Sequence, residues 1–122
     1  MIALDTCAWI ALFRCEDTAE AYQKALRGAD VIVPTPCVHE VYRHLRSILG
    51  DESLAELAVT SMASYRCAPL TIEAAEMAAR IEEPPHLSAC DRFVYAIART
   101  HNATLWTHDP DLKVLPQVHC IA

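Results

Sequence analysis

The amino-acid sequence predicts an α/β fold, a three-layer domain with a short, mostly parallel central sheet flanked by helices. Short apolar segments of strand type alternate along the chain with longer segments whose apolar residues recur at helical spacing. Such alternation is typical of α/β domains. The 122 residues, 53% of them hydrophobic, are enough for a domain with its own core. We therefore expect a single domain over residues 1–122.

The predicted strands are short and apolar. In chain order they are residues 2–4, 31–34, 67–70, 103–106 and 118–121. Residues 31–34 (VIVP) carry the clearest signal, because β-branched side chains favour a pleated, half-buried surface. The helical segments between the strands supply the crossovers that parallel pairing requires.

Helices are predicted at about residues 8–13, 17–27, 35–49, 51–65, 71–82 and 88–100. Most of these segments begin with a residue type that satisfies the free N–H groups of a first turn. These signals are the capping box Asp17/Glu20, Thr35-Pro36 with proline at the first helical position, Asp51 or Ser53, Thr71, and Ser88. Gly28 and Gly50 follow two of the segments, where a helix would stop.

Composition excludes several classes of protein. Only two glycines occur, so no glycine-rich phosphate loop of the P-loop or Rossmann type can form. The net charge of −6 argues against a general nucleic-acid coat but permits an enzyme that meets phosphate through bound cations. The six cysteines show no zinc-site spacing and are expected to be reduced. With no apolar run of membrane-spanning length and no basic start to residues 1–13, we expect a cytoplasmic protein without membrane contact.

Four acidic residues follow or precede the predicted strands in a consistent way. Asp5 comes directly after the first strand, Glu40 lies early in the helix after residues 31–34, and Asp109 follows residues 103–106. Asp91 lies in the first turn of the helix that leads into that strand. Ligands of open parallel sheets bind beyond the carboxyl ends of the strands, so these acids are predicted to share one site.

Taken singly, each acid also has a structural interpretation. Asp91 has capping-box spacing with Ser88, and Asp109 lies in a D-P-D turn. Glu40 has a basic residue at ion-pairing distance along its helix, and Asp5 is a possible cap for the next turn. Only the four acids taken together favour a shared functional site. Several carboxylates in one pocket repel one another unless cations are present, and Mg²⁺ or Mn²⁺ prefers such oxygen ligands and activates water for phosphodiester hydrolysis.

Three segments resemble the PIN-domain family, most closely the VapC-like toxin ribonucleases of VapBC toxin–antitoxin pairs. They are IALDTCAWIAL (2–12), PTPCVHEVYRHL (34–45) and HLSACDRFVYAIARTHNATLWTHDPDL (86–112). No single motif is specific, but the matches span nearly the whole chain in the family's order. Two positions depart from the family pattern: Cys7 stands where a small hydroxyl or amide residue is common, and Leu112 where a Phe is frequent.

The resemblance implies four catalytic, metal-binding acids, which by position are Asp5, Glu40, Asp91 and Asp109. It implies supporting roles for Thr6, Thr107 and Asp111, and Asp111 is the substitute if Asp109 is not the fourth ligand. The implied activity is Mg²⁺- or Mn²⁺-dependent RNA hydrolysis by the toxin of a type II toxin–antitoxin system. The implied partners are an RNA substrate, a cognate antitoxin and a second copy of the chain.

Arg43 and Arg92 lie nearest the predicted acids in sequence and are candidates for RNA or antitoxin contacts, although solvated helix residues of this kind often pair with local acids. The alternative function is a non-cleaving PIN-fold module that binds RNA or protein. Phosphoryl-transfer classes fit less well. A receiver domain would need an acidic pair after the first strand, and a haloacid-dehalogenase-type phosphatase would need Asp-x-Asp where the chain has Asp5-Thr6-Cys7.

Overall fold

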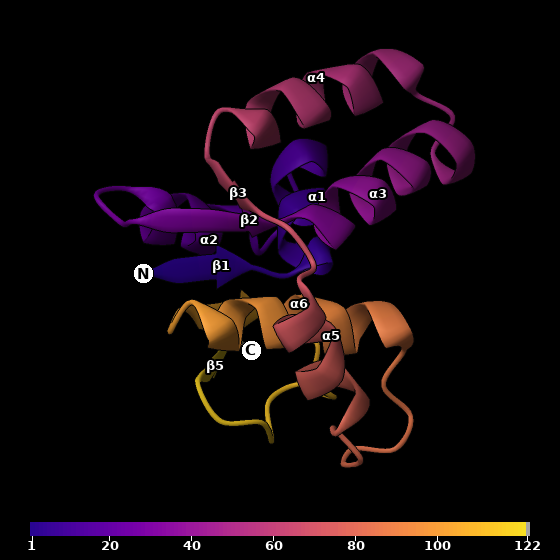
Figure 1. The fold of residues 1–122 in the computed structure, drawn as a ribbon. Coiled ribbons are helices and arrows are strands. Elements are labelled where there is room, and N and C mark those ends of the chain that lie inside the picture. Colours follow the sequence, from indigo (N-terminus) through magenta and orange to yellow (C-terminus); the bar gives the residue numbers. More distant parts are fainter. Residues whose placement is uncertain (122) are drawn as a thin grey trace.

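Residues 1–121 of the computed structural model form a single sheet of five parallel strands flanked by helices (Figure 1). The strands are β1 (Ile2–Leu4), β2 (Val31–Pro34), β3 (Arg66–Ala68), β4 (Thr104–Thr107) and β5 (Val118–Cys120). The predicted α/β fold with a parallel sheet is confirmed, and all five predicted strands are present within two residues of the expected positions.

The strand order is β3-β2-β1-β4-β5. From β1 the chain first builds outward to β2 and β3, and later adds β4 and β5 on the other side. The order therefore reverses at β1, between β2 and β4, and a crevice for ligands opens at such a switch point, outside the carboxyl ends of the strands. Because Leu4 pairs with Trp106, the residues that follow β1 and β4 are neighbours at this crevice.

Six α-helices lie within residues 1–121. They are α1 (Thr6–Arg14), α2 (Ala19–Leu26), α3 (Thr35–Arg43), α4 (Glu52–Ala63), α5 (Ile72–Ala79) and α6 (Ala89–Thr100). A π-helical turn, η1 (His44–Ile48), continues α3, and α3 and α4 lie side by side (Figure 1). None of these helices is long and apolar enough to cross a membrane.

Three of the predicted helix caps are confirmed. The Asp51 side chain accepts a hydrogen bond from the Leu54 N–H, and the Thr71 side chain accepts one from the Ala74 N–H. Ser88 caps α6 in the same way, as part of a complete capping box. These caps form because they need only residues within three positions of one another.

The capping box predicted for Asp17 and Glu20 is wrong. The helix begins at Ala19 with Thr18 before it, and no side chain caps its N–H groups. Just upstream, α1 ends at Cys15 in a left-handed conformation, and the Glu16 N–H bonds back to the Ala11 carbonyl. Asp17 therefore lies within the turn between α1 and α2, one residue before the cap position of α2.

The helix expected over residues 35–49 also differs from the prediction. Regular α-helix ends at Arg43, and the Leu49 N–H then bonds to the His44 carbonyl at 2.9 Å, five residues back. Wider winding of this type is rare in proteins and frequently occurs at functional sites. Gly50 follows with φ at +78°, a conformation that glycine adopts without steric cost.

The core lies on both sides of the central strands. Its largest fully buried members include Leu4, Ile32 and Leu105 from the sheet, with Trp9 and Tyr22 from the first two helices. Trp9 is buried in this core, whereas Trp106 and Phe93 are only partly buried and pack against it. All six cysteines are free thiols, as expected.

Candidate active site

Asp5 lies at the switch point of the sheet and is almost completely buried, with 4% of its surface exposed. Its backbone N–H bonds to the Trp106 carbonyl, so the chain leaves β1 still paired to β4. Although Asp5 directly precedes α1, its side chain does not cap that helix. The carboxylate instead accepts a hydrogen bond from the Thr107 hydroxyl at 3.0 Å. The carboxylate is thus held in place by the neighbouring strand.

Thr107 ends β4 and is fully buried. Its hydroxyl donates to Asp5 and accepts a hydrogen bond from the Asp109 N–H, also at 3.0 Å. One hydroxyl therefore ties the acid after β1 to the backbone of the acid after β4. This contact explains why a threonine stands two positions before Asp109, and it supports the positioning role predicted for Thr107.

Glu40 reaches the same region from α3. The Thr6 hydroxyl donates to the Glu40 carboxylate at 2.6 Å, a contact between residues 34 positions apart. The alternative interpretation, an ion pair with a basic residue on its own helix, finds no support, since no ion pair of Glu40 occurs within residues 1–121. Thr6 thus orients the second acid much as Thr107 orients the first.

Asp91 serves two purposes at once. It forms the reciprocal capping box with Ser88, accepting from the Ser88 N–H at 3.4 Å, and so closes the first turn of α6. It is also partly buried, and burial raises the pKa of its carboxyl, with further increases from the charges of Asp109 and Glu40. The capping interpretation is correct, and it coexists with electrostatic proximity to the other acids.

The D-P-D turn separates the roles of its two acids. An Asp109 carboxylate oxygen accepts a hydrogen bond from the Asp111 N–H at 2.9 Å, so the turn is self-bonded. Asp111 is exposed and lies 3.1 Å from the His86 imidazole. Asp109 is the one that raises the pKa of Asp91. The geometry therefore supports Asp109 over Asp111 as the member of the acid cluster.

The electrostatics join the four acids into one cluster. The pKa of Asp5 is raised to about 6, first by burial and then by the charge of Asp91. The charges of Asp109 and Glu40 in turn raise the pKa of Asp91. The charges of Asp91, Asp109 and Glu40 thus act on a neighbouring acid from separate elements, so the four carboxylates form one electrostatic cluster, as expected for a site that holds positive charge.

The donor set fits a hard divalent cation in chemistry and in charge. All four side chains offer carboxylate oxygens, which Mg²⁺ and Mn²⁺ prefer, and their repulsion would be relieved by such an ion. Within residues 1–121, however, no three His, Cys, Asp or Glu side chains lie close enough together to hold a metal ion in their present positions. The arrangement is thus an open carboxylate cluster.

Neighbouring side chains to which the sequence assigned no role also touch the site. The Cys7 thiol lies 3.6 Å from the Asp5 carboxylate and 3.3 Å from the Thr107 hydroxyl. The Tyr22 hydroxyl contacts His108 Nδ1 at 2.7 Å, which anchors the segment between Thr107 and Asp109. A tyrosine on a buried helix face normally finds a partner for its hydroxyl, but only the fold reveals which one.

The two predicted arginine contacts differ in their surroundings. Arg92 donates from Nε to the Ile81 carbonyl at 3.1 Å and from its guanidinium to the Pro85 carbonyl at 3.3 Å, so it stabilises the α5–α6 loop. Arg43 lines a hollow that Glu40 and Thr6 also line. A contact of either residue with RNA or antitoxin stays a prediction, and the position of Arg43 is the more favourable.

A parallel sheet whose switch point carries clustered carboxylates defines a class of α/β nuclease-like domain, and sequence comparison identifies the family. Residues 2–117 match the PIN domain, and the chain belongs to this family. No curated protein sequence matches it.

Solved structures extend the comparison to toxin–antitoxin systems. A toxin–antitoxin complex from Klebsiella pneumoniae contains a chain with a TM-score of 0.81 and 18% identity, covering 99% of this chain and 100% of that one. VapC20 of Mycobacterium tuberculosis, described as a Sarcin-Ricin loop cleaving toxin, has a TM-score of 0.76 and 22% identity, with 93% of each chain covered. DNA-bound VapBC from Salmonella typhimurium has a TM-score of 0.78 and 12% identity, covering 99% and 98%. At these identities the likeness shows a shared fold, that of VapC toxins.

Proposed function

We propose that this PIN domain is a metal-dependent endoribonuclease and acts as the toxin of a toxin–antitoxin pair. The observation that carries the proposal is the buried Asp5 at the switch point, whose pKa is raised to about 6 beside the charge of Asp91. A buried acid in such a cluster costs stability when ionised, and acids of this kind concentrate at functional sites. A bound cation would offset that cost.

In this proposal Asp5, Glu40, Asp91 and Asp109 hold Mg²⁺ or Mn²⁺. When bound, the ion lowers the pKa of a water molecule and stabilises the charge that develops on the phosphodiester. The chain's own task is to fix the carboxylate oxygens. Thr107 does so for Asp5 and for the Asp109 backbone, and Thr6 does so for Glu40. Removing such a supporting group typically lowers metal affinity or activity tenfold to a hundredfold.

The partners are proposed from the structural relatives. The chains from Klebsiella pneumoniae and Salmonella typhimurium were crystallised with their antitoxins. By analogy, this chain is expected to be one domain over residues 1–122, cytoplasmic, held inactive by a cognate antitoxin and paired with a second copy of itself. Its activity and its partners are separate expectations, since each can fail without the other.

The second candidate is a PIN-fold module that binds RNA or protein without cleaving it. One observation favours it: within residues 1–121 the acidic side chains do not converge tightly on a metal position. The presence of all four acids in one electrostatic cluster favours the nuclease.

Cleavage of end-labelled total RNA tests the proposal. We expect cuts with Mg²⁺ or Mn²⁺, none with EDTA, and a loss of at least about a hundredfold in Asp5→Ala, since metal-assisted hydrolysis contributes several kcal/mol. The matched control is Asp30→Ala, which removes an exposed acid at the opposite edge of the sheet. Activity that survives EDTA or Asp5→Ala would contradict the proposal. No cleavage by folded, antitoxin-free protein would favour the binding module.

A further inference from the structure

The structure points to a path for the substrate strand beyond the carboxylate cluster. We infer that single-stranded RNA crosses α3, with Arg43 binding a phosphate beside the cleaved one and with the hollow between α3 and α4 receiving an adjacent nucleotide. This inference rests on the proposed RNA substrate but concerns binding, which is measurable without cleavage.

Two hollows of the surface share a wall on α3. The first, of about 480 Å³, is lined by Thr6 and by Glu40, one of the four acids, and includes Ile10. The second, of about 400 Å³, lies between α3 and α4. His39 and Arg43 line both. A polymer strand that enters the first hollow at Glu40 therefore passes Arg43 before it reaches the second hollow.

Arg43 is suited to bind an anion at this junction. It is exposed, and no carboxylate within residues 1–121 lies at ion-pairing distance from it. Arg46, one turn further along, is held by Glu52 at 3.2 Å. In a chain of net charge −6, a polyanion needs a local cationic group next to the acids, and on α3 that group is Arg43.

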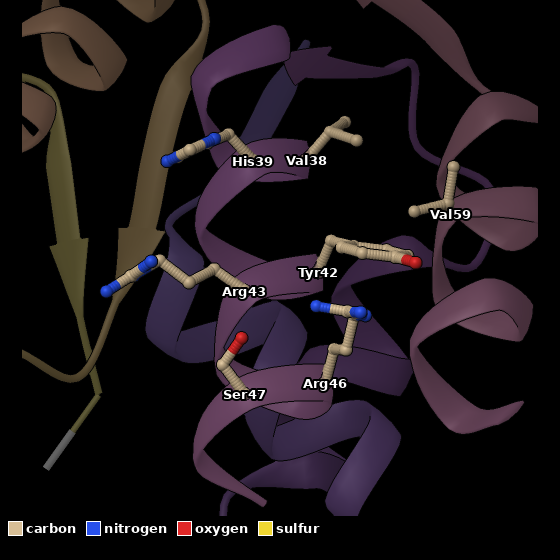
Figure 2. A pocket seen from close by; sticks show the side chains of 7 residues that line it. All are labelled: Val38, His39, Tyr42, Arg43, Arg46, Ser47 and Val59. Atoms are coloured by element: carbon tan, nitrogen blue, oxygen red, sulfur yellow. The ribbon is translucent and has the colours of Figure 1, made fainter. Parts of the chain in front are cut away.

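The second hollow has the surfaces that a base requires. Figure 2 shows Val38 and Tyr42 of α3 and Arg46 of η1 extending toward Val59 on α4, whereas Arg43 extends to another side of α3. The Tyr42 hydroxyl donates to Glu56 of α4 at 2.8 Å, which fixes the aromatic ring against that helix. A fixed ring beside apolar side chains is a stacking platform for an unpaired base.

RNA suits this path better than a protein segment does. The hollow that Arg43 lines also contains Glu40, one of the four acids, and any strand presented for cleavage has further phosphates on either side of the scissile one. A guanidinium close to Glu40 would therefore meet a phosphate in every productive complex. Arg43 is thus a positioning residue for the strand.

Binding measurements on the Asp5→Asn protein test the inference, because that background removes cleavage. The probe is a short fluorescein-labelled single-stranded RNA followed by anisotropy over a range of salt concentrations. Arg43→Gln should weaken binding about tenfold and lower the slope of log affinity against log salt by about 0.7. Arg43→Lys should restore the slope. The matched control is Arg27→Gln, an exposed arginine just after α2, near the amino end of β2.

The outcomes separate this inference from the proposed function. If wild type does not cleave RNA yet binding depends on Arg43, the inference stands and the nuclease proposal fails. If wild type cleaves but Arg43→Gln binds like the Arg27→Gln control, the inference alone is overturned. It is also overturned if no RNA binds, or if Arg43→Gln changes only the oligomeric state in analytical ultracentrifugation, because the surface would then be a protein interface.

Discussion

Asp5→Asn raises the free energy of unfolding of the metal-free protein at neutral pH by up to about 3 kcal/mol. The Asp5 pKa of about 6 exceeds its unfolded value of 3.8 because the carboxyl is buried and lies near the charge of Asp91. Between these values the folded state binds more protons than the unfolded state, so stability falls as pH rises from about 4 to about 6. Above that window the full cost of about two pKa units applies. An asparagine avoids it and still accepts the Thr107 hydrogen bond.

Chemical denaturation of both proteins as a function of pH measures this effect. The stability difference should vanish below about pH 4, where the aspartic acid is protonated in both states. The same concentration of Mn²⁺ should stabilise wild type more than Asp5→Asn, since a ligand that binds the folded state stabilises it according to its affinity. If Asp5→Asn is no more stable than wild type at neutral pH, ionisation of the buried Asp5 carboxyl does not lower the stability of the folded protein, and the prediction is wrong.

Thr107→Val should cost about 1–3 kcal/mol of stability and at least about tenfold in RNA cleavage. Valine keeps the shape of threonine but leaves the Asp109 N–H without its acceptor and Asp5 without its donor. Both losses occur in a fully buried position, where water cannot replace the hydroxyl. The site would therefore lose the hydroxyl that links the Asp5 carboxylate to the Asp109 backbone.

Thr107→Ser is the matched control, because it keeps the hydroxyl and removes one methyl group. Its cleavage rate should stay within a few-fold of wild type, while its stability falls by roughly 1 kcal/mol from the lost methyl. Parallel denaturation and cleavage assays measure both quantities. If valine is tolerated as well as serine, the hydrogen bonds of Thr107 do not organise the site.

Local signals account for the parts of the fold that the sequence predicted. Residues 31–34 form a strand because four consecutive apolar residues are all buried. Ser88 and Asp91 form their capping box because the two residues lie within one helical turn of each other. The positions of Asp5 and Asp109 after strands also followed from sequence, since the carboxyl ends of parallel strands meet at one edge.

Contacts between distant residues account for what the sequence did not predict. The α1–α2 turn displaced Asp17 because α1 ends in a left-handed residue, which only the packing of both helices determines. The Thr6–Glu40 hydrogen bond joins residues 34 positions apart, and local spacing instead suggested an ion pair for Glu40. The hollows along α3 depend on how α4 packs against it, so the place of Arg43 between them required the structure.

Calorimetric titration of Mn²⁺ tests most directly whether four carboxylates from four elements make one cation site. Wild type is compared with Asp5→Asn, Glu40→Gln, Asp91→Asn and Asp109→Asn, with Asp30→Asn as an exposed control. Each of the four site substitutions should lower the affinity at least about tenfold, and Asp30→Asn and Asp111→Asn should leave it unchanged. An affinity for Mn²⁺ that is the same in Asp5→Asn as in wild type would contradict the account.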